Sequence, residues 1–173
     1  MACMATRTSA GILLYRRTDS RLETLLAHPG GPLFSHRDEG YWSIPKGEPD
    51  GEEPLLDVAM REFTEETGHP VPDGPIVDLG YIVQKGGKVV HAWAVEGDLD
   101  PDLAVSNTFA MEWPPRSGRT ASFPEIDRVE WFDQAEARVR IKATQVPLLE
   151  RLDAALAILV RTAARTPGSS PGR

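Results

Sequence analysis

Three acidic side chains recur at helical spacing between residues 62 and 66. Glu62 and Glu66 are four residues apart and Glu65 falls between them, so a helix would place all three on or beside one face. Carboxylates at this spacing repel one another and destabilise a helix by roughly 0.2–0.5 kcal/mol per pair. Mg²⁺ reverses the sign of that interaction, because it binds carboxylate oxygens and still keeps positions for water and phosphate. Taken alone, such a run favours a solvated acidic face, and a metal site is the alternative that the longer pattern below favours.

The three acids belong to a longer pattern of fixed spacing. The pattern reads Gly47, five residues, Glu53, seven residues, Arg61-Glu62-Phe63, one residue, Glu65-Glu66, one residue and Gly68. It resembles the Nudix box of the Nudix hydrolase (MutT-like) family, and its length makes the match specific. The residue after Gly68, usually aliphatic in the family, is His69, and we expect Val71 to fill that place. The resemblance implies an α/β fold: the Nudix α/β/α sandwich with a mixed central sheet, and the box as a loop, helix and loop beside it.

The resemblance also assigns roles to the box residues. In Nudix hydrolases the matching glutamates hold divalent metal, and one of them often serves as the general base. This implies that Glu62 and Glu66 are ligands of Mg²⁺ or Mn²⁺, with Glu65 as a further ligand or the base. Arg61 and Glu53 are supporting residues in the family, where the arginine pairs with box carboxylates and fixes their geometry. For Arg61 the alternative is a plain surface ion pair with Glu65, four residues on.

The residues that lead into the box indicate contact with phosphate. A tryptophan followed by Pro45-Lys46-Gly47 is similar to the dinucleoside polyphosphate hydrolase branch of the family. Lys46 offers a point charge to a phosphate, and its alternative is an exposed lysine. At Gly47 we expect the backbone to turn sharply close to the metal. The resemblance implies that a carbonyl oxygen of Lys46 or Gly47 completes the metal shell.

Outside the box, one further acid is a candidate. Glu125 precedes a predicted late strand, and several Nudix enzymes recruit a metal ligand or base from a loop in this place; a solvated glutamate is the equal alternative. Arg116 and Arg119 are interpreted as exposed loop arginines, with phosphate contact as the alternative. His91 is interpreted as a packed histidine. Core packing is expected, ahead of stacking on a nucleobase, for Trp93, Trp113 and Trp131.

Length and composition limit the kind of protein. The 173 residues suggest one domain over residues 1–165, followed by a tail over 166–173 whose composition is typical of disorder. A formal net charge of −7 argues against a general binder of nucleic acid or membrane surfaces. The single cysteine, Cys3, excludes an internal disulfide and is interpreted as an incidental thiol. No signal peptide or membrane-spanning run is visible, so we expect a cytoplasmic protein that is a monomer or homodimer.

The expected secondary structure places the box helix among strands. Short strands are predicted over residues 10–15, 22–27, 42–44, 108–113 and 129–132, and a hairpin over 77–84 and 88–95 turns at Gly86-Gly87. A helix of about 14 residues is predicted between Pro54 and Gly68. Residues 28–41 and 113–124 are expected to be loops, the second of them functional. Asp133 is expected to cap a short helix, and Thr144 to open the last helix. The predicted core-facing stripe of that last helix comprises Val146, Leu149, Leu152, Leu156 and Leu159.

The box and its setting together predict an enzyme. We expect a metal-dependent pyrophosphohydrolase, acting on acid anhydrides in phosphorus-containing compounds, that cleaves a nucleoside diphosphate linked to another group. A dinucleoside polyphosphate is the first expected substrate, and a nucleoside triphosphate is the second. Two other classes stay open. One is a Nudix-fold sensor that binds a nucleotide or a partner protein without catalysis, and the other is an acidic α/β interaction domain with a chance motif.

Overall fold

A mixed β-sheet forms the centre of the protein in the computed structural model, which describes residues 7–19 and 21–165. In that described part the strands of the sheet are β1 (Thr8–Thr18), β2 (Arg21–Pro29), β3 (Lys46–Gly47), β4 (Ile76–Val83), β5 (Val89–Glu96) and β8 (Ile126–Asp133). They follow the order β4-β5-β1-β2-β8, and β3 pairs with β1. β1 runs parallel to β5 and antiparallel to β2, so the sheet is mixed, as predicted. The predicted tail over residues 166–173 and Cys3 lie outside the described residues.

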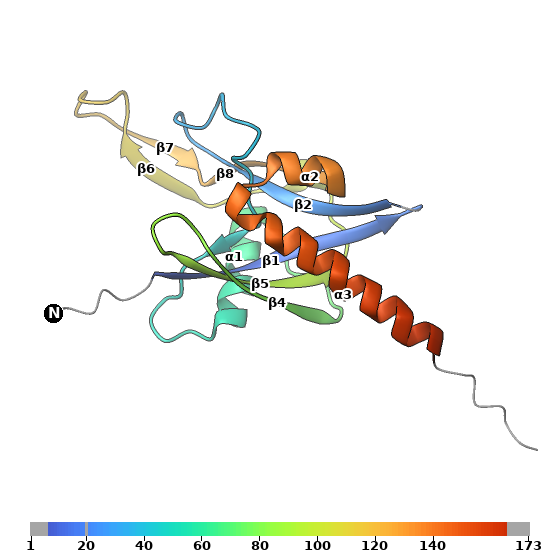
Figure 1. Ribbon diagram of the computed structural model, residues 1–173. Coiled ribbons are helices and arrows are strands. Elements are labelled where there is room, and N and C mark those ends of the chain that lie inside the picture. The colour runs from blue at the N-terminus through green and yellow to red at the C-terminus, as the bar shows by residue number, and fades with distance from the viewer. Residues whose placement is uncertain (1–6, 20, 166–173) are drawn as a thin grey trace, which may run out of the picture.

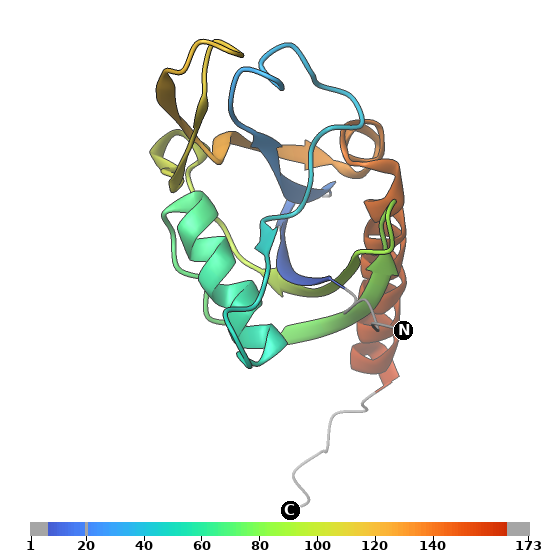
Figure 2. The same cartoon turned by 90° about the vertical axis from the view of Figure 1, so that its left-hand side faces the viewer.

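Helices cover both faces of this sheet (Figure 2). On one face lies α1 (Leu55–Thr67), and on the other lie α2 (Gln134–Arg140) and α3 (Val146–Arg165). Side chains alternate along β1 and serve both layers: Ile12 and Leu14 pack on the α1 side, and Leu13 packs on the α3 side. The predicted α/β/α sandwich is therefore confirmed. Among the described helices, none has the length and apolarity needed to cross a membrane.

The helix α1 begins and ends where the sequence predicts. Pro54 precedes its first residue, and Gly68 ends it in the left-handed conformation (φ 74°), donating its N–H to the carbonyl oxygen of Thr64. Phe63 is fully buried against the sheet, so the helix presents its acids on the faces that remain. Val71 packs against the same apolar cluster, as predicted.

Two hairpins differ in how well the sequence predicts them. β4 and β5 pair antiparallel around Gly86 and Gly87, which both have positive φ (85° and 80°), as predicted. The predicted loop over residues 113–124 is wrong in its second half, because Thr120–Pro124 forms β7 and pairs with β6 (Thr108–Glu112). Phe109 faces Phe123 across that pair, with ring centroids 6.1 Å apart, and such a contact favours a hairpin that the Gly- and Pro-rich turn obscures. Figure 1 shows this hairpin extending away from the main sheet.

The strand predicted over residues 42–44 is also wrong. The short strand β3 lies at Lys46–Gly47, and Trp42 and Ser43 form only isolated bridges. The physical reason is that the amide of Ile44 donates to the side-chain Oε1 of Gln145 (3.0 Å), which takes that position out of a strand ladder.

The C-terminal elements follow the prediction with shifted ends. Asp133 caps α2 by accepting a hydrogen bond from the amide of Glu136 (2.9 Å), as predicted. A 3-10 turn η2 (Ala143–Gln145) occupies the predicted start of α3 at Thr144, so the helix begins at Val146. Leu159 is 51% exposed and does not belong to the buried stripe, because the last turns of α3 extend past β4 (Figure 1).

Candidate active site

The chain enters α1 through a very close approach between Gly47 and Glu62. A Cβ atom added to Gly47 would lie 1.9 Å from Cδ of Glu62, so only glycine leaves room for that carboxylate. The short strand β3 fixes the position of Gly47 by pairing with β1, where Gly11 lies opposite Lys46. A Cβ atom on Gly11 would lie 2.5 Å from the carbonyl oxygen of Pro45. Two glycines therefore allow the residues before the box to lie directly against both strand and helix.

Arg61 contacts two acids of α1 and one acid of the loop before it. Its guanidinium lies 2.9 Å from Oε2 of Glu53, 2.8 Å from Oε1 of Glu62 and 3.2 Å from Oε2 of Glu65. Its Nη2 also donates to the backbone carbonyl of Glu48 (3.1 Å), which ties down the loop before the helix. The hydrogen bonds with Glu53 raise the pKa of Arg61 and lower the pKa of Glu53. Arg61 is thus able to orient several carboxylates at once, whereas a plain surface ion pair would hold only one.

Glu66 is bonded to the backbone at the entry to the box. The amide N–H of Lys46 donates to Oε2 of Glu66 (3.1 Å). Burial raises the pKa of Glu66 to about 8, against the attraction of the Lys46 ammonium. Burial likewise lowers the pKa of Lys46 to about 8, and the Glu66 carboxylate opposes that change. Both side chains are thus held where ionisation is unfavourable, which a bound cation and a bound phosphate would correct.

A relay of backbone hydrogen bonds brings Glu125 beside the box from a distant part of the sequence. The amide of Asn107 donates to the carbonyl of Glu65 (2.9 Å), and the amide of Glu125 donates to the carbonyl of Asn107 (2.8 Å). The amide of Gly30 completes the relay by donating to the carbonyl of Glu125 (2.8 Å). The negative charge of Glu125 contributes to the raised pKa of Glu66, so the two carboxylates lie within electrostatic reach.

These acids form a set of hard oxygen donors. Burial raises the pKa of Glu62, Arg61 opposes the shift, and the charges of Glu65 and Glu125 add to it. The side chain of Glu62 is 12% exposed and that of Glu65 is 36% exposed, so neither extends freely into solvent. Over the described ranges, no three acidic, histidine or cysteine side chains converge into a finished metal cage. Carboxylates crowded on one face, with a glycine cradle beneath one of them, nevertheless fit a divalent cation.

A cavity of about 250 Å³ opens beside the box helix. It lies between α1, the 3-10 turn η1 (Pro101–Leu103) with the residues after it, and the start of β8. Its polar lining side chains are Glu66, Asp102, Ser106, Asp127 and Arg128. A polar ligand in this cavity would therefore reach Glu66, the acid of the box whose pKa burial raises to about 8.

The two loop arginines lie apart from the acids. Arg116 and Arg119 are exposed in the turn between β6 and β7. That turn lies at the far end of the hairpin that extends from the sheet in Figure 1. Their position agrees with the interpretation as exposed loop arginines.

The aromatic candidates pack in different ways. His91 stacks on Trp93 with 4.2 Å between ring centroids, and its Nε2 lies 2.8 Å from Oδ1 of Asp78, as expected for a packed histidine. Trp93 is buried, and Trp131 is half-buried against the same apolar cluster. Trp113 lies outside both core clusters, in the β6–β7 hairpin, where it meets a phenylalanine edge to face, so the expected core packing is wrong for Trp113.

Sequence reasoning misses two residues that shape this region. Asn107 acts through its backbone, which leaves no signal in the choice of side chain. Lys142 reads as a solvated lysine before a helix, yet burial lowers its pKa, and the neighbouring charge of Lys88 lowers it further. Its amide donates to the carbonyl of Trp42 (2.8 Å), which ties it to the entry of the box. Only the tertiary structure brings these segments together.

Comparison with known proteins identifies the family and the fold. The family model described as NUDIX domain matches residues 3–152. A Caenorhabditis elegans Ap4A hydrolase in a binary complex is similar with a TM-score of 0.58 and 21% identity, over 88% of this chain and 98% of that chain. The NUDIX domain of Shewanella oneidensis NrtR, complexed with ADP ribose, is similar with a TM-score of 0.62 and 18% identity, over 90% of this chain and 91% of that chain. A mutT/nudix family protein from Listeria innocua has a TM-score of 0.59 and 17% identity, over 90% of this chain and 97% of that chain. These structures share the fold.

One sequence relative is a larger protein. An octanoyltransferase from Myxococcus xanthus is 34% identical over 102 residues, which make up 59% of this chain and 25% of that protein. The similarity therefore concerns about a quarter of that relative's length. Because the family model covers most of the chain and every charged position of the box is present, this chain belongs to the NUDIX domain family.

Proposed function

We propose that the protein uses a divalent metal to hydrolyse a pyrophosphate bond in a nucleoside diphosphate linked to another group. A dinucleoside polyphosphate is the first candidate substrate, and a nucleoside triphosphate is the second. The observation that carries the proposal is the arrangement around Arg61, whose guanidinium bonds Glu62 and Glu65 on the box helix and Glu53 in the loop before it. A solvated acidic face would not need an arginine to fix its carboxylates.

The acids divide into ligands and a base. Glu62 and Glu66 would hold Mg²⁺ or Mn²⁺, with Glu65 and Glu125 as a further ligand or the base. Such an ion, when bound, neutralises phosphate oxygens and lowers the pKa of water that it binds. A backbone carbonyl of Lys46 or Gly47 is the further oxygen donor that the family resemblance implies.

The protein's own groups would then position the substrate and move one proton. The Lys46 ammonium offers positive charge to the phosphate chain beside Glu66. A carboxylate, from Glu65 or Glu125, accepts a proton from the attacking water as the water oxygen bonds to phosphorus. The bond from phosphorus to the bridging oxygen breaks, and the leaving phosphate takes the electron pair. Arg61 acts through the acids by keeping them oriented.

The choice of first substrate rests on two observations. The entry Pro45-Lys46-Gly47 is similar to that of dinucleoside polyphosphate hydrolases, and an Ap4A hydrolase is among the structures of similar fold. The panel below tests which of the two candidate substrates is cleaved.

The test is a panel of nucleotide pyrophosphates with Mg²⁺ or Mn²⁺. It comprises a dinucleoside tetraphosphate, a nucleoside triphosphate, ADP ribose and a nucleoside diphosphate sugar, with products identified in ¹⁸O-labelled water. Glu62→Gln and Glu66→Gln are expected to lose activity by about 10²–10⁴-fold, the range seen when acid–base or ligand groups are removed. Glu52→Gln is the matched control, because Glu52 is an exposed acid in the loop that precedes α1. Full activity in Glu66→Gln would overturn the assignment.

A second candidate function is nucleotide sensing without turnover. The NUDIX domain of NrtR was solved with ADP ribose, and its TM-score of 0.62 is the highest of the three structures compared above. Calorimetric titration with ADP ribose distinguishes the two candidates. Tight binding with no product in either metal would favour the sensor.

A further inference from the structure

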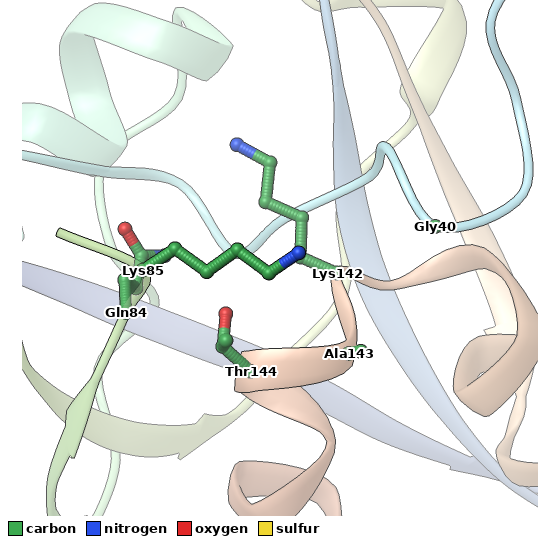
Figure 3. A pocket seen from close by; sticks show the side chains of 6 residues that line it. All are labelled: Gly40, Gln84, Lys85, Lys142, Ala143 and Thr144. Carbon is green, nitrogen blue, oxygen red and sulfur yellow. The ribbon is translucent and has the colours of Figure 1, made fainter.

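A pocket of about 350 Å³ lies between the β4–β5 turn and the segment that leads into α3. Its lining residues are Gly40, Gln84, Lys85, Lys142, Ala143 and Thr144, and no acid is among them. Figure 3 shows the side chain of Lys85 reaching across the space toward Lys142, with the hydroxyl of Thr144 facing it. The pocket thus presents hydrogen-bond donors from two distant parts of the chain.

These donors lack partners of their own. In the described part of the chain, the side-chain Nε2 of Gln84 is buried with no acceptor. Neither Lys85 nor Lys142 forms an ion pair or a side-chain hydrogen bond there. An unpaired buried amide donor destabilises the folded protein, and an acceptor bound in this pocket would satisfy it together with the two ammonium groups.

The backbone holds Lys142 in place beside the box. The amide of Lys142 donates to the carbonyl of Trp42 (2.8 Å), and the amide of Ile44 donates to Oε1 of Gln145 (3.0 Å). These two bonds join the segment before α3 to the segment that enters the box. Lys142 is therefore a positioned cation at the edge of the active site.

All four lysines of the sequence gather in this region. They are Lys46, Lys85, Lys88 and Lys142. The charges of Lys88 and Lys142 both lower the pKa of Lys46, and the charge of Lys88 lowers that of Lys142, so the three lie within electrostatic reach. Arginines supply the ion pairs elsewhere, as Arg16, Arg61, Arg138 and Arg140 do. Lys88 is paired with Glu48 (2.9 Å), whereas Lys85 and Lys142 have no ion-pair partner among the described residues, in a protein of net charge −7.

We propose that Lys85, Lys142 and Gln84 form an oxyanion subsite that binds phosphate groups of the substrate beyond the bond that is cleaved. This inference rests on the proposed function and extends it to specificity. The ammonium groups and the Gln84 amide donate to phosphate oxygens, while the carboxylates of the box lie toward the bond that breaks. The subsite favours substrates with a long phosphate chain over those with two phosphates.

Kinetics test the subsite with two substrates of different chain length. Lys142→Met and Lys85→Met should each raise KM for a dinucleoside tetraphosphate about tenfold with kcat little changed, the loss expected for one charge-assisted hydrogen bond. KM for a dinucleoside diphosphate should stay the same. Arg161→Met removes an equal charge from an exposed position on α3 and should change neither KM. Unchanged KM for the tetraphosphate in both lysine variants would overturn the subsite even if the enzyme is active.

Direct binding separates this inference from the proposed function. Isothermal titration of the EDTA-treated protein with inorganic tripolyphosphate requires no turnover. The wild type and Arg161→Met should bind alike, and each lysine variant about tenfold more weakly. Lys85 is exposed, so Lys85→Met should fold normally, and its circular dichroism and melting temperature confirm this. Lysine-dependent binding in a protein that hydrolyses nothing would uphold the oxyanion site while the proposed function fails.

Competition places the subsite within the substrate site. Tripolyphosphate should inhibit hydrolysis of the tetraphosphate competitively in the wild type, and about tenfold more weakly in Lys142→Met. Noncompetitive inhibition would show a separate effector site for phosphate chains and would overturn the proposal.

Discussion

Gly47 lies so close to Glu62 that a Cβ atom on residue 47 would fall 1.9 Å from Cδ of the glutamate. The backbone of Gly47 does not have the positive φ that favours glycine, in contrast to Gly51 (φ 65°) and Gly68 (φ 74°). The expected sharp turn is therefore not what requires glycine here. The requirement is space: Gly47, the first residue of the box, leaves room for the carboxylate of Glu62, which approaches from the helix.

Gly47→Ala should separate folding from activity. The clash falls on the far end of a flexible side chain, so Glu62 can move aside and the protein should melt within a few degrees of the wild type. The displaced carboxylate should lower activity by about 10–100-fold, as disruption of the groups that orient metal ligands does. Thermal denaturation and kcat/KM with Mg²⁺ measure the two effects. Gly74→Ala is the control, since its added Cβ would meet nothing closer than 3.5 Å.

Arg61→Lys should keep the positive charge but lose the hydrogen bonds that hold Glu53 and Glu62 in place. The guanidinium bonds Glu53 and Glu62 through different nitrogens, which a single ammonium cannot do with the same geometry. We expect kcat/KM to fall by about 10–100-fold and the affinity for Mn²⁺, measured by electron paramagnetic resonance, to weaken. Arg17→Lys alters an exposed, long ion pair of 3.8 Å and should change neither quantity. Wild-type activity in Arg61→Lys would mean that the acids need no fixed orientation.

Local patterns predict the helix and one hairpin, but not how distant segments meet. The ends of α1 follow from Pro54 and Gly68, whose conformational preferences act within a few residues. The strand β7 escapes prediction because its pairing partner, and not its own composition, decides its structure. The place of Glu125 beside the box is suggested by resemblance alone, since it depends on backbone bonds through Asn107. The pocket lined by Lys85 and Lys142 could not be predicted from the sequence, because its lining residues come from separate elements.

Glu125→Gln tests whether the acid delivered by that relay takes part in catalysis. The substitution keeps the backbone bonds of residue 125 and removes only the charge. As a ligand or base, Glu125 should account for at least about tenfold of kcat. Glu150→Gln, an exposed acid on α3, is the control. Equal kcat in the two variants and the wild type would leave Glu125 as a solvated glutamate.

Glu66 should destabilise the metal-free protein in a pH-dependent way. Its folded-state pKa is raised by burial from the ordinary 4.5 to about 8, so folding favours the protonated carboxyl. The stability that this gives is fully present below pH 4.5 and is lost as pH rises through about 8. Glu66→Gln imitates the protonated form and can still accept the hydrogen bond from the Lys46 amide. In EDTA, the variant should therefore melt at the same temperature as the wild type at pH 4.5 and above it at pH 8.5.

Metal should reverse that difference. A cation that binds the folded protein stabilises it in proportion to the logarithm of its concentration above Kd, and each kcal/mol raises the melting temperature of a domain this size by about 2–4 °C. With saturating Mg²⁺ at pH 8.5, the wild type should gain stability and Glu66→Gln should gain much less. Glu52→Gln should follow the wild type in both conditions, because it removes an exposed charge. If Glu66→Gln gains as much from Mg²⁺ as the wild type does, Glu66 is not a metal ligand, and its raised pKa reflects only burial and the neighbouring carboxylates.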